Sequence, residues 1–409
     1  MKLHKTLLLG AAGLALAHVA SAQTIIRIAG SNGDRNATNA AIANLLQGET
    51  YVGIAVNGNP GTPQSSNFGN FVGGTFNGTP VTVKTSYLGA TGGVKAVAGS
   101  EPVRFLPTNA TGNLNPNPLT ATDPSQYEDA VPDFAVSTNF QSTSPYIGFY
   151  NGKNYIELEQ ILTGVAPMVF LASPGFPGDN LHTSAAQALY SRGYIPLSFL
   201  TGNSAHRNQT VFAIGRNFDA GQRYCPLAEM GLGVNAVTKH YQPTIQNGVV
   251  TSHTLWPVEV VSGVSSQFPG NGGFNSGANL VAALVVPLGP NAYKVGNPNA
   301  TAGYYIGYAT PGDAVTANAG GAKTLKWNGV AYSQDAVREG QYTLWLYTRV
   351  VYDPNLGAPG SGKELHRAFA DAIANEVITT TGSSGGGILI GTMQVYRESE
   401  SAPVIPTYL

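Results

Sequence analysis

The chain has 409 residues, enough for two domains of ordinary size, and 43% of them are hydrophobic, which is normal for a globular protein. Charged residues make up only 11% and the formal net charge is −1, a balance that excludes a basic nucleic-acid surface and an acidic tail. The 51 glycines and 26 prolines are interleaved with apolar runs, so we expect long loops on a folded body and not disorder.

The N-terminus has the pattern of a secretory signal peptide. Basic residues precede the apolar run 7–16, and an Ala-x-Ala cleavage pattern ends at Ala22. We therefore expect residues 1–22 to be removed and the mature protein to be periplasmic or secreted. The apolar run is too short to span a bilayer comfortably, and no later stretch reaches membrane-spanning length. No integral membrane segment is expected after cleavage.

Strand and helix patterns alternate along the first part of the mature chain. The opening is an apolar strand, a glycine-rich turn and a helical stripe, and two further strands are separated by glycine-, asparagine- and proline-rich stretches. The predicted elements are a strand at Thr24–Ala29, a helix at Asp34–Leu46, a loop-rich stretch at Gln47–Pro80, a strand at Val81–Leu88, a long loop at Glu101–Tyr127 and a strand at Asp133–Ser137.

The remaining elements continue this alternation. They include an apolar crossover, several strands and one helix whose apolar residues recur four apart. In chain order they are the crossover Val165–Ala172, a helix at Thr183–Arg192, a strand at Thr210–Gly215, a strand at Leu255–Val261, a helix at Ser276–Leu284, a strand at Gly303–Thr310, a strand at Gln341–Tyr352 and a helix at Lys363–Ile378. The pattern predicts an α/β protein with mainly parallel sheets.

Four turns at strand ends are candidate ligand sites, because ligands of parallel α/β sheets bind beyond the carboxyl ends of the strands. They contain Ser31-Asn32, Thr91-Gly92, Ser137-Thr138 and Arg216–Gln222. Arg216 follows a buried strand, and a helix that began after its turn would favour an anion there. The alternative is that Arg216 forms an ordinary surface or interdomain salt bridge.

The order and spacing of the motifs resemble the type 2 periplasmic binding proteins, in particular the phosphate-binding proteins of ABC phosphate transporters. The landmarks are the AGSN turn ending at Asn32, YLGATGGVKA at Tyr87–Ala96, DFAVST at Asp133–Thr138, GRNFDAGQR at Gly215–Arg223, GYYIGYA at Gly303–Ala309 and EGQYTLWLYTRVVY at Glu339–Tyr352. The resemblance implies two α/β lobes, joined by two crossovers, that close on an oxyanion like a hinge. On this basis residues 23–165 and 339–409 form lobe I, and residues 166–338 form lobe II.

The resemblance also assigns ligand-binding roles residue by residue. Ser31 or Asn32 falls in the first anion-binding turn, Thr91 falls in the second, where the family usually has serine, and Ser137 matches a family serine. Arg216 matches the arginine that clamps the anion. Further departures occur at Thr138, which stands where the family has aspartate, and in Ala220, Gly221 and Gln222, which stand where it has Ser-Gly-Thr, so that only the glycine is kept.

These departures affect selectivity more than the existence of a site. The family's aspartate accepts a hydrogen bond from a protonated phosphate oxygen and repels fully ionised anions, whereas Thr138 carries no charge. Ala220 removes a hydroxyl donor, while Gln222 keeps an amide donor of longer reach. A pocket of donors is therefore expected, without the family's discrimination for phosphate. The long loops 47–80 and 99–127 exceed those of compact family members and can cover or reshape the cleft.

Other chemistries have weak support. The stretch GAPGSGK at Gly357–Lys363 fits part of a P-loop, but Glu364 follows where Ser or Thr should hold magnesium, so a glycine-rich turn that opens a helix is preferred. No second ligand pair supports a metal site, and no serine-hydrolase elbow is present.

We therefore expect a binding protein without catalytic activity, cofactor, metal or nucleic-acid partner, which captures phosphate or a similar oxyanion and passes it to an ABC permease. The second hypothesis is an extracellular structural or interaction protein on the same fold with a degraded anion site.

Overall fold

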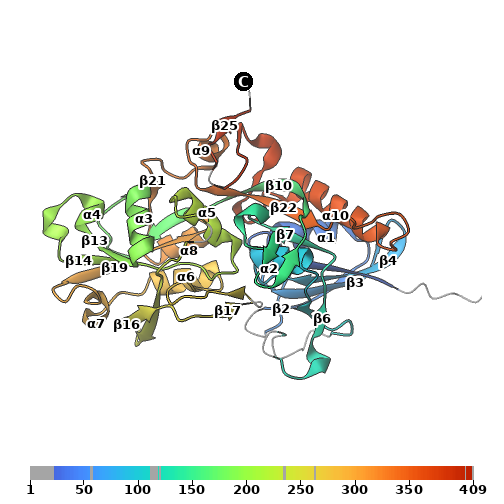
Figure 1. Cartoon of the computed structure of the whole chain (residues 1–409), viewed down its shortest axis with the longest axis horizontal. Coiled ribbons are helices and arrows are strands. Elements are labelled where there is room, and N and C mark those ends of the chain that lie inside the picture. The colour runs from blue at the N-terminus through green and yellow to red at the C-terminus, as the bar shows by residue number, and fades with distance from the viewer. Residues whose placement is uncertain are drawn as a thin grey trace, which may run out of the picture.

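The computed structural model describes residues 23–55, 59–110, 118, 121–233, 236–261, 264–400 and 402–407. The expected signal peptide, residues 1–22, lies outside them. Figure 1 shows two lobes side by side, each built around its own sheet with helices packed on it. The two-lobed α/β class predicted from the sequence is thereby confirmed. Within the described residues, no helix combines the length and the apolar character needed to cross a membrane.

The first sheet forms the lobe at the right of Figure 1. Its strand order is β2 (Thr50–Ile54), β3 (Phe68–Phe76), β4 (Thr79–Ser86), β1 (Thr24–Gly30), β7 (Phe134–Ser137), β22 (Trp345–Tyr352), β10 (Glu159–Pro167) and β23 (Ile388–Leu389). Helices α1 (Arg35–Leu45) and α10 (Glu364–Glu376) pack on one face, and α2 (Ala90–Ala98) packs on the other. The alternation within β7 follows from this: Phe134 and Val136 lie in the apolar cluster of α1 and α10, whereas Ala135 lies in that of α2.

The second sheet forms the lobe at the left. Its strand order is β13 (Tyr194–Pro196), β14 (Gln209–Ala213), β19 (Ala302–Ala309), β11 (Val169–Ala172) and β20 (Lys323–Thr324). The helices of this part of the chain are α3 (Thr183–Arg192), α4 (Ser198–Thr201), α5 (Gly221–Glu229), α6 (Gly277–Leu284), α7 (Pro290–Tyr293), α8 (Pro311–Ala319) and α9 (Gln334–Arg338).

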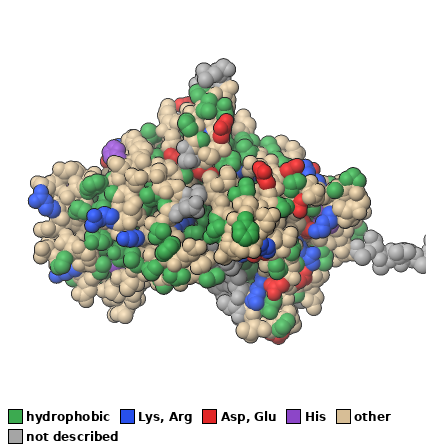
Figure 2. Space-filling model, viewed as in Figure 1, with side chains coloured by type: hydrophobic (Ala, Val, Ile, Leu, Met, Phe, Trp, Pro, Cys, Tyr) green, Lys and Arg blue, Asp and Glu red, His purple; other side chains and the backbone are tan. Residues whose placement is uncertain are grey.

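Small two-stranded sheets lie outside the two main sheets in both lobes. They are β5 (Val103–Phe105) with β6 (Glu128–Ala130), β8 (Gly148–Tyr150) with β9 (Lys153–Tyr155), β12 (Asn180–Leu181) with β21 (Lys326–Trp327), β15 (Tyr241–Gln246) with β16 (Val249–Leu255), β17 (Val260–Val261) with β18 (Val264–Ser265), and β24 (Val395–Tyr396) with β25 (Ile405–Pro406). On the face shown in Figure 2, most side chains are apolar or uncharged, and acidic and basic groups are scattered.

The chain crosses between the sheets twice. Only Met168 separates β10 of the first sheet from β11 of the second, and the chain returns ahead of β22. Trp345 and Tyr347 of β22 belong to the same buried apolar cluster as Phe170 of β11, so the core runs continuously from one lobe into the other. We propose lobe boundaries at 165/166 and 338/339.

The sheets are mixed, which corrects the expectation that they are mainly parallel. Parallel pairing is confined to β1 with its neighbours β4 and β7 and to β14 with β19, and the other pairings within the two sheets are antiparallel. A tight hairpin joins β3 to β4, β2 pairs antiparallel with β3, and the long strands β10 and β22 also run antiparallel to each other.

The stretch 47–80, expected to be mainly loop, contains β2 and β3. Asn77 and Gly78 join β3 to β4 with φ angles of 49° and 75°, the positive values that a tight hairpin turn requires. Phe68 and Phe71 of β3 are buried. The Asn-Gly pair was the available sequence signal for this hairpin, and the many glycines of β3 hid its alternation.

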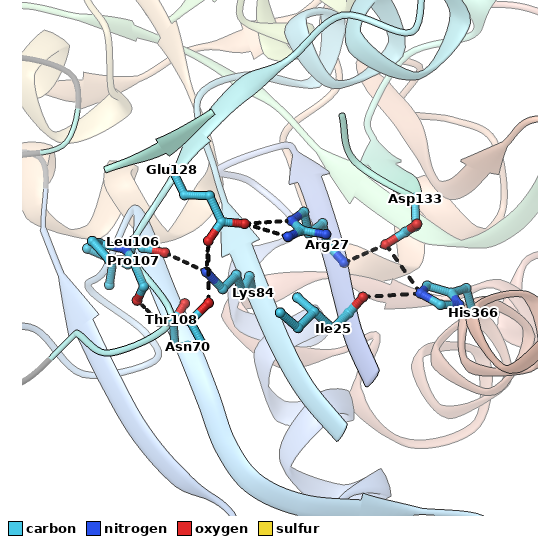
Figure 3. A network of polar contacts seen from close by, with 10 residues as sticks. All are labelled: Ile25, Arg27, Asn70, Lys84, Leu106, Pro107, Thr108, Glu128, Asp133 and His366. Carbon is cyan, nitrogen blue, oxygen red and sulfur yellow. Dashed lines mark hydrogen bonds and ion pairs between the residues drawn. The ribbon is translucent and has the colours of Figure 1, made fainter. Parts of the chain in front are cut away.

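The second long stretch, which leads into β7, is tied to the sheet by a buried polar network (Figure 3). The Nζ of Lys84, which is fully buried, donates to Leu106 O at 2.9 Å and to Glu128 Oε2 at 2.5 Å. The other oxygen of Glu128 accepts from Arg27 Nε at 3.0 Å. Burial lowers the pKa of Lys84, and Glu128 opposes that effect. The Glu128 carboxylate therefore ties the β5–β6 segment to the sheet and favours the charged form of Lys84.

Replacing Glu128 by glutamine is expected to lower the free energy of unfolding by about 2 kcal/mol, because Lys84 stays buried without a charged partner. Urea denaturation of the mature protein measures this. The control is Asp371→Asn, which breaks the more exposed pair with Arg367 on α10 and should cost less than 1 kcal/mol. Equal effects of the two substitutions would contradict the anchoring role of Glu128.

Candidate functional site

The predicted turns follow the carboxyl ends of β1, β4, β7 and β14 in the region between the lobes, but the eight predicted residues lie in separate places there. Thr91, Ser137, Thr138 and Gly221 are fully enclosed, and we call them the inner cluster. Asn32, Arg216 and Gln222 line a groove between the lobes. Ser31 stabilises the turn in which it lies, since its Oγ accepts a hydrogen bond from Gly33 N at 3.0 Å.

The hydroxyls of the inner cluster lie around oxygens of Asn139. Ser137 Oγ is 3.1 Å from the backbone oxygen and 3.3 Å from the side-chain oxygen of Asn139 and can donate to either, and Thr91 Oγ1 lies 3.5 Å from the side-chain oxygen. A Cβ placed on Gly221 would lie 2.9 Å from that oxygen and 2.3 Å from Thr138 Oγ1. Thr138 Oγ1 is buried and has no hydrogen-bond partner among the described residues. The four predicted residues of the inner cluster are thus brought together, around Asn139.

A carboxylate lies beside the inner cluster. Asp219, in the turn between β14 and α5, is fully buried, and a Cβ placed on Gly92 would lie 2.6 Å from its Oδ2. A Cβ on Gly89 would lie 2.4 Å from its backbone oxygen. Both glycines belong to the start of α2, where unpaired N–H groups and the helix dipole favour negative charge. The second lobe therefore places a carboxylate at the N-terminus of a helix in the first lobe.

Arg216 is held in place by uncharged oxygens. Its Nε donates to Phe274 O at 3.0 Å, its Nη2 donates to Asn275 O at 3.1 Å, and its Nη1 donates to the side-chain oxygen of Gln222. Burial lowers the pKa of Arg216, and Tyr308 and Asp313 oppose that shift. No carboxylate pairs with it among the described residues, so the salt bridge considered from the sequence is not formed.

The groove between the lobes has a volume of about 1190 Å³. It is lined by polar amides, apolar side chains, two arginines and two carboxylates, Glu259 and Asp313, and we call it the interlobe groove. Its main lining residues are Asn32, Gly33, Arg35, Asn36, Asn67, Leu88, Arg216, Asn217, Gln222, Trp256, Phe274, Asn275, Asn279 and Asp313. Arg35 comes from α1 in the first lobe, whereas Arg216 follows β14 in the second.

Sequence reasoning missed Arg35 and Asp313. Arg35 opens α1 directly after the first predicted turn, its Nε has no hydrogen-bond partner among the described residues, and burial lowers its pKa. Asp313 lies in the first turn of α8, where its Oδ2 accepts from Oγ1 of Thr310, the N-cap residue, at 2.9 Å. The position of each residue just beyond a strand and its turn was a usable signal.

A smaller cavity of about 40 Å³ shares Gln222 and Thr310 with the groove and is also lined by Asp34 and Arg349 among others. It has room for a water molecule. Burial raises the pKa of Asp34 well above its usual range, against the effects of Ser31 and Arg349. Gln222 reaches across from the second lobe, since a Cβ on Gly33 would lie 2.8 Å from its Nε2. This contact joins the first and fourth predicted turns.

The P-loop-like stretch is satisfied by its own chain. Lys363 Nζ pairs with Asp133 Oδ1 at 2.9 Å, and Gly360 N donates to Glu364 Oε1 at 2.8 Å. These contacts agree with a turn that opens α10, and they pair Lys363 with the Asp133 carboxylate. Among the described residues, no group of three or more His, Cys, Asp or Glu side chains is placed to hold a metal ion.

No protein-family model and no curated protein sequence matches the chain. Solved structures with similar overall architecture include an ABC-type phosphate transport receptor from Vibrio cholerae, with 13% identity, a TM-score of 0.44 and coverage of 87% of this chain and 98% of that one. PstS from Borrelia burgdorferi has 12% identity, a TM-score of 0.39 and coverage of 90% and 98%. A phosphate-binding protein from Stenotrophomonas maltophilia has 14% identity, a TM-score of 0.36 and coverage of 89% and 87%. At these values the similarities carry no inference about the ligand of this chain.

Proposed function

We propose that the chain is a solute-binding protein that captures an anionic solute in the interlobe groove. The observation that carries the proposal is that the groove receives one arginine from each lobe, Arg35 and Arg216. A phosphate or another oxyanion group, free or part of a larger molecule, is the ligand chemistry that paired guanidinium groups suit best. The proposal requires no catalysis.

The fixed position of Arg216 supports this role. Two backbone carbonyls and one amide oxygen use three of its five N–H groups, which leaves two for a ligand. Because these partners are uncharged, the positive charge of Arg216 is not cancelled by a contacting carboxylate. A guanidinium that is already oriented loses little entropy when an anion binds. Asn32 and Gln222, predicted from the sequence, would add amide donors at the same groove.

The location and partners follow from the same proposal. A mature protein starting near Gln23, periplasmic or secreted, would collect the solute and hand it to an ABC permease. The second candidate function is an interaction protein with a degraded anion site. The inner cluster favours it, because Asn139 and Asp219 occupy the surroundings of the predicted donors.

Isothermal titration calorimetry of residues 23–409 tests the proposal with sodium phosphate, sodium sulfate, glucose 6-phosphate and gluconate. We expect at least one of them to bind. Arg216→Gln and Arg35→Gln should each weaken that binding by about ten- to a hundredfold, since a hydrogen bond to a charged group contributes about 1.5–3 kcal/mol.

The matched control is Arg192→Gln, at the exposed end of α3, which should leave the affinity unchanged. Absence of heat with all four anions, from protein shown to be folded, would overturn the solute-binding proposal. Binding that survives both groove substitutions would place the ligand elsewhere.

A further inference from the structure

We infer that Asp219 and Asn139 act as a built-in substitute for a small oxyanion, and that Asp219 thereby excludes inorganic phosphate and sulfate from the inner cluster. The inference deepens the proposed function and takes from it only the premise that an anion binds in the interlobe groove. In this view, Asp219 determines which anions the protein accepts.

The first step is that two helix N-termini meet at this place. Helices α2 and α5 each have nine residues, and α5 begins at Gly221. A Cβ on Gly221 would lie 2.6 Å from the Cβ of Ala90, the first residue of α2. Each helix end carries a partial positive charge and N–H groups without intrahelical partners. Negative oxygens that lie between or beside two such ends stabilise their close approach.

The second step is that hydroxyl donors complete the enclosure. Thr91, Ser137 and Thr138 are all fully buried here, and Thr138 Oγ1 is close to Gly221 without a hydrogen-bond partner among the described residues. The hydroxyls of the first lobe, together with a helix N-terminus from each lobe, are a donor set for an oxyanion. Because Thr138 Oγ1 has no partner among the described residues, the cluster offers at least one hydrogen-bond donor that the described part of the chain does not use.

The third step is that oxygens of the chain already occupy this space. The side-chain oxygen of Asn139 accepts from Ser137, and the Asp219 carboxylate lies against Gly92, where any side chain would collide with it. The four residues of the inner cluster line neither the interlobe groove nor the small cavity. A free oxyanion would therefore have to displace the Asp219 carboxylate, which is also negatively charged and is part of the chain. In the interlobe groove, the anion is bound by Arg35 and Arg216 instead.

Thermal unfolding and calorimetry with Asp219→Ala test the inference, with sodium phosphate and sodium sulfate as probes and sodium chloride at matched ionic strength as the reference. Asp219→Ala should be less stable than the natural protein in chloride and should regain several degrees of Tm in phosphate or sulfate. It should bind phosphate at least tenfold more tightly than the natural protein does, and that gain should persist in Asp219→Ala/Arg216→Gln. Asp219→Asn, which still fills the space, should show no such gain.

A folded Asp219→Ala protein without gained phosphate binding would overturn the inference. If that variant does not fold, the phosphate affinity of Arg216→Gln is compared with that of the natural protein. An undiminished affinity would show that phosphate enters the inner cluster and would overturn the inference. Failure of the proposed function looks different: the natural protein would bind no anion in its groove, while Asp219→Ala would still gain phosphate.

Discussion

Replacing Arg397 by alanine is expected to lower the free energy of unfolding by about 4 kcal/mol, the typical effect of breaking a buried ion pair from one side. Arg397 follows β24, its side chain is almost fully buried, and its Nη1 donates to Glu229 of α5. Its guanidinium also lies 3.9 Å from the centre of the Trp345 ring. Burial already raises the pKa of Glu229, and Arg397 counters that effect. Without the arginine, this carboxylate would keep uncharged hydrogen-bond donors such as Thr343 Oγ1, at 2.8 Å.

The comparison that isolates the buried charge uses Arg338→Ala and a double variant. Arg338 pairs with Asp335 at the surface, so its loss should cost less than 1 kcal/mol. Arg397→Met combined with Glu229→Gln should be more stable than Arg397→Met alone, because no unpaired charge remains buried. Urea denaturation monitored by tryptophan fluorescence measures all of them. An Arg397→Ala protein within 1 kcal/mol of the natural one would show that the C-terminal segment is not anchored through this pair.

Acidification below pH 6.5 is expected to remove several kcal/mol of stability, because two buried histidines must stay neutral in the folded protein. Burial and the charge of Arg223 lower the pKa of His240 to about 3, and burial lowers the pKa of His253 to about 4. His240 Nδ1–H donates to Gly272 O at 2.8 Å. His253 Nδ1 lies 2.9 Å from Tyr305 Oη.

The direction follows from proton linkage. Both folded pKa values lie below the unfolded value of about 6.5, so the unfolded chain binds more protons between about pH 3 and 6.5. The stabilisation is complete above pH 6.5 and is lost as the pH falls, by up to about 1.4 kcal/mol per pH unit for each histidine. Urea unfolding at pH 7.5, 6, 5 and 4 measures the slope. The variant His240→Asn/His253→Asn should show a clearly flatter dependence, and an unchanged slope would assign the acid sensitivity to other groups.

The helices and strands that local periodicity could reveal were predicted well. Helices α1 and α10 match the expected ranges 34–46 and 363–378 within two residues, because their apolar positions recur with the helical period and face one sheet. The hairpin β15–β16 was missed, although Asn247 and Gly248 have the positive φ angles of a tight turn. Its strands are largely exposed and lack a continuous apolar face, so periodicity gave no signal.

The sequence by itself determined the α/β class, the turns at the strand ends and the residue types that donate hydrogen bonds there, and its resemblance to a known family implied the two lobes. The class, the turns and the donors are local properties of strand, glycine and hydroxyl patterns, and the structure brings Thr91, Ser137, Thr138 and Gly221 together. Only the tertiary structure decided what those donors surround. The meeting of α2 with α5 places the chain's own Asn139 and Asp219 at the helix ends, and contacts with Phe274, Asn275 and Gln222 hold Arg216 at the interlobe groove. No local pattern encodes such a meeting, because it depends on how segments from two lobes pack against each other.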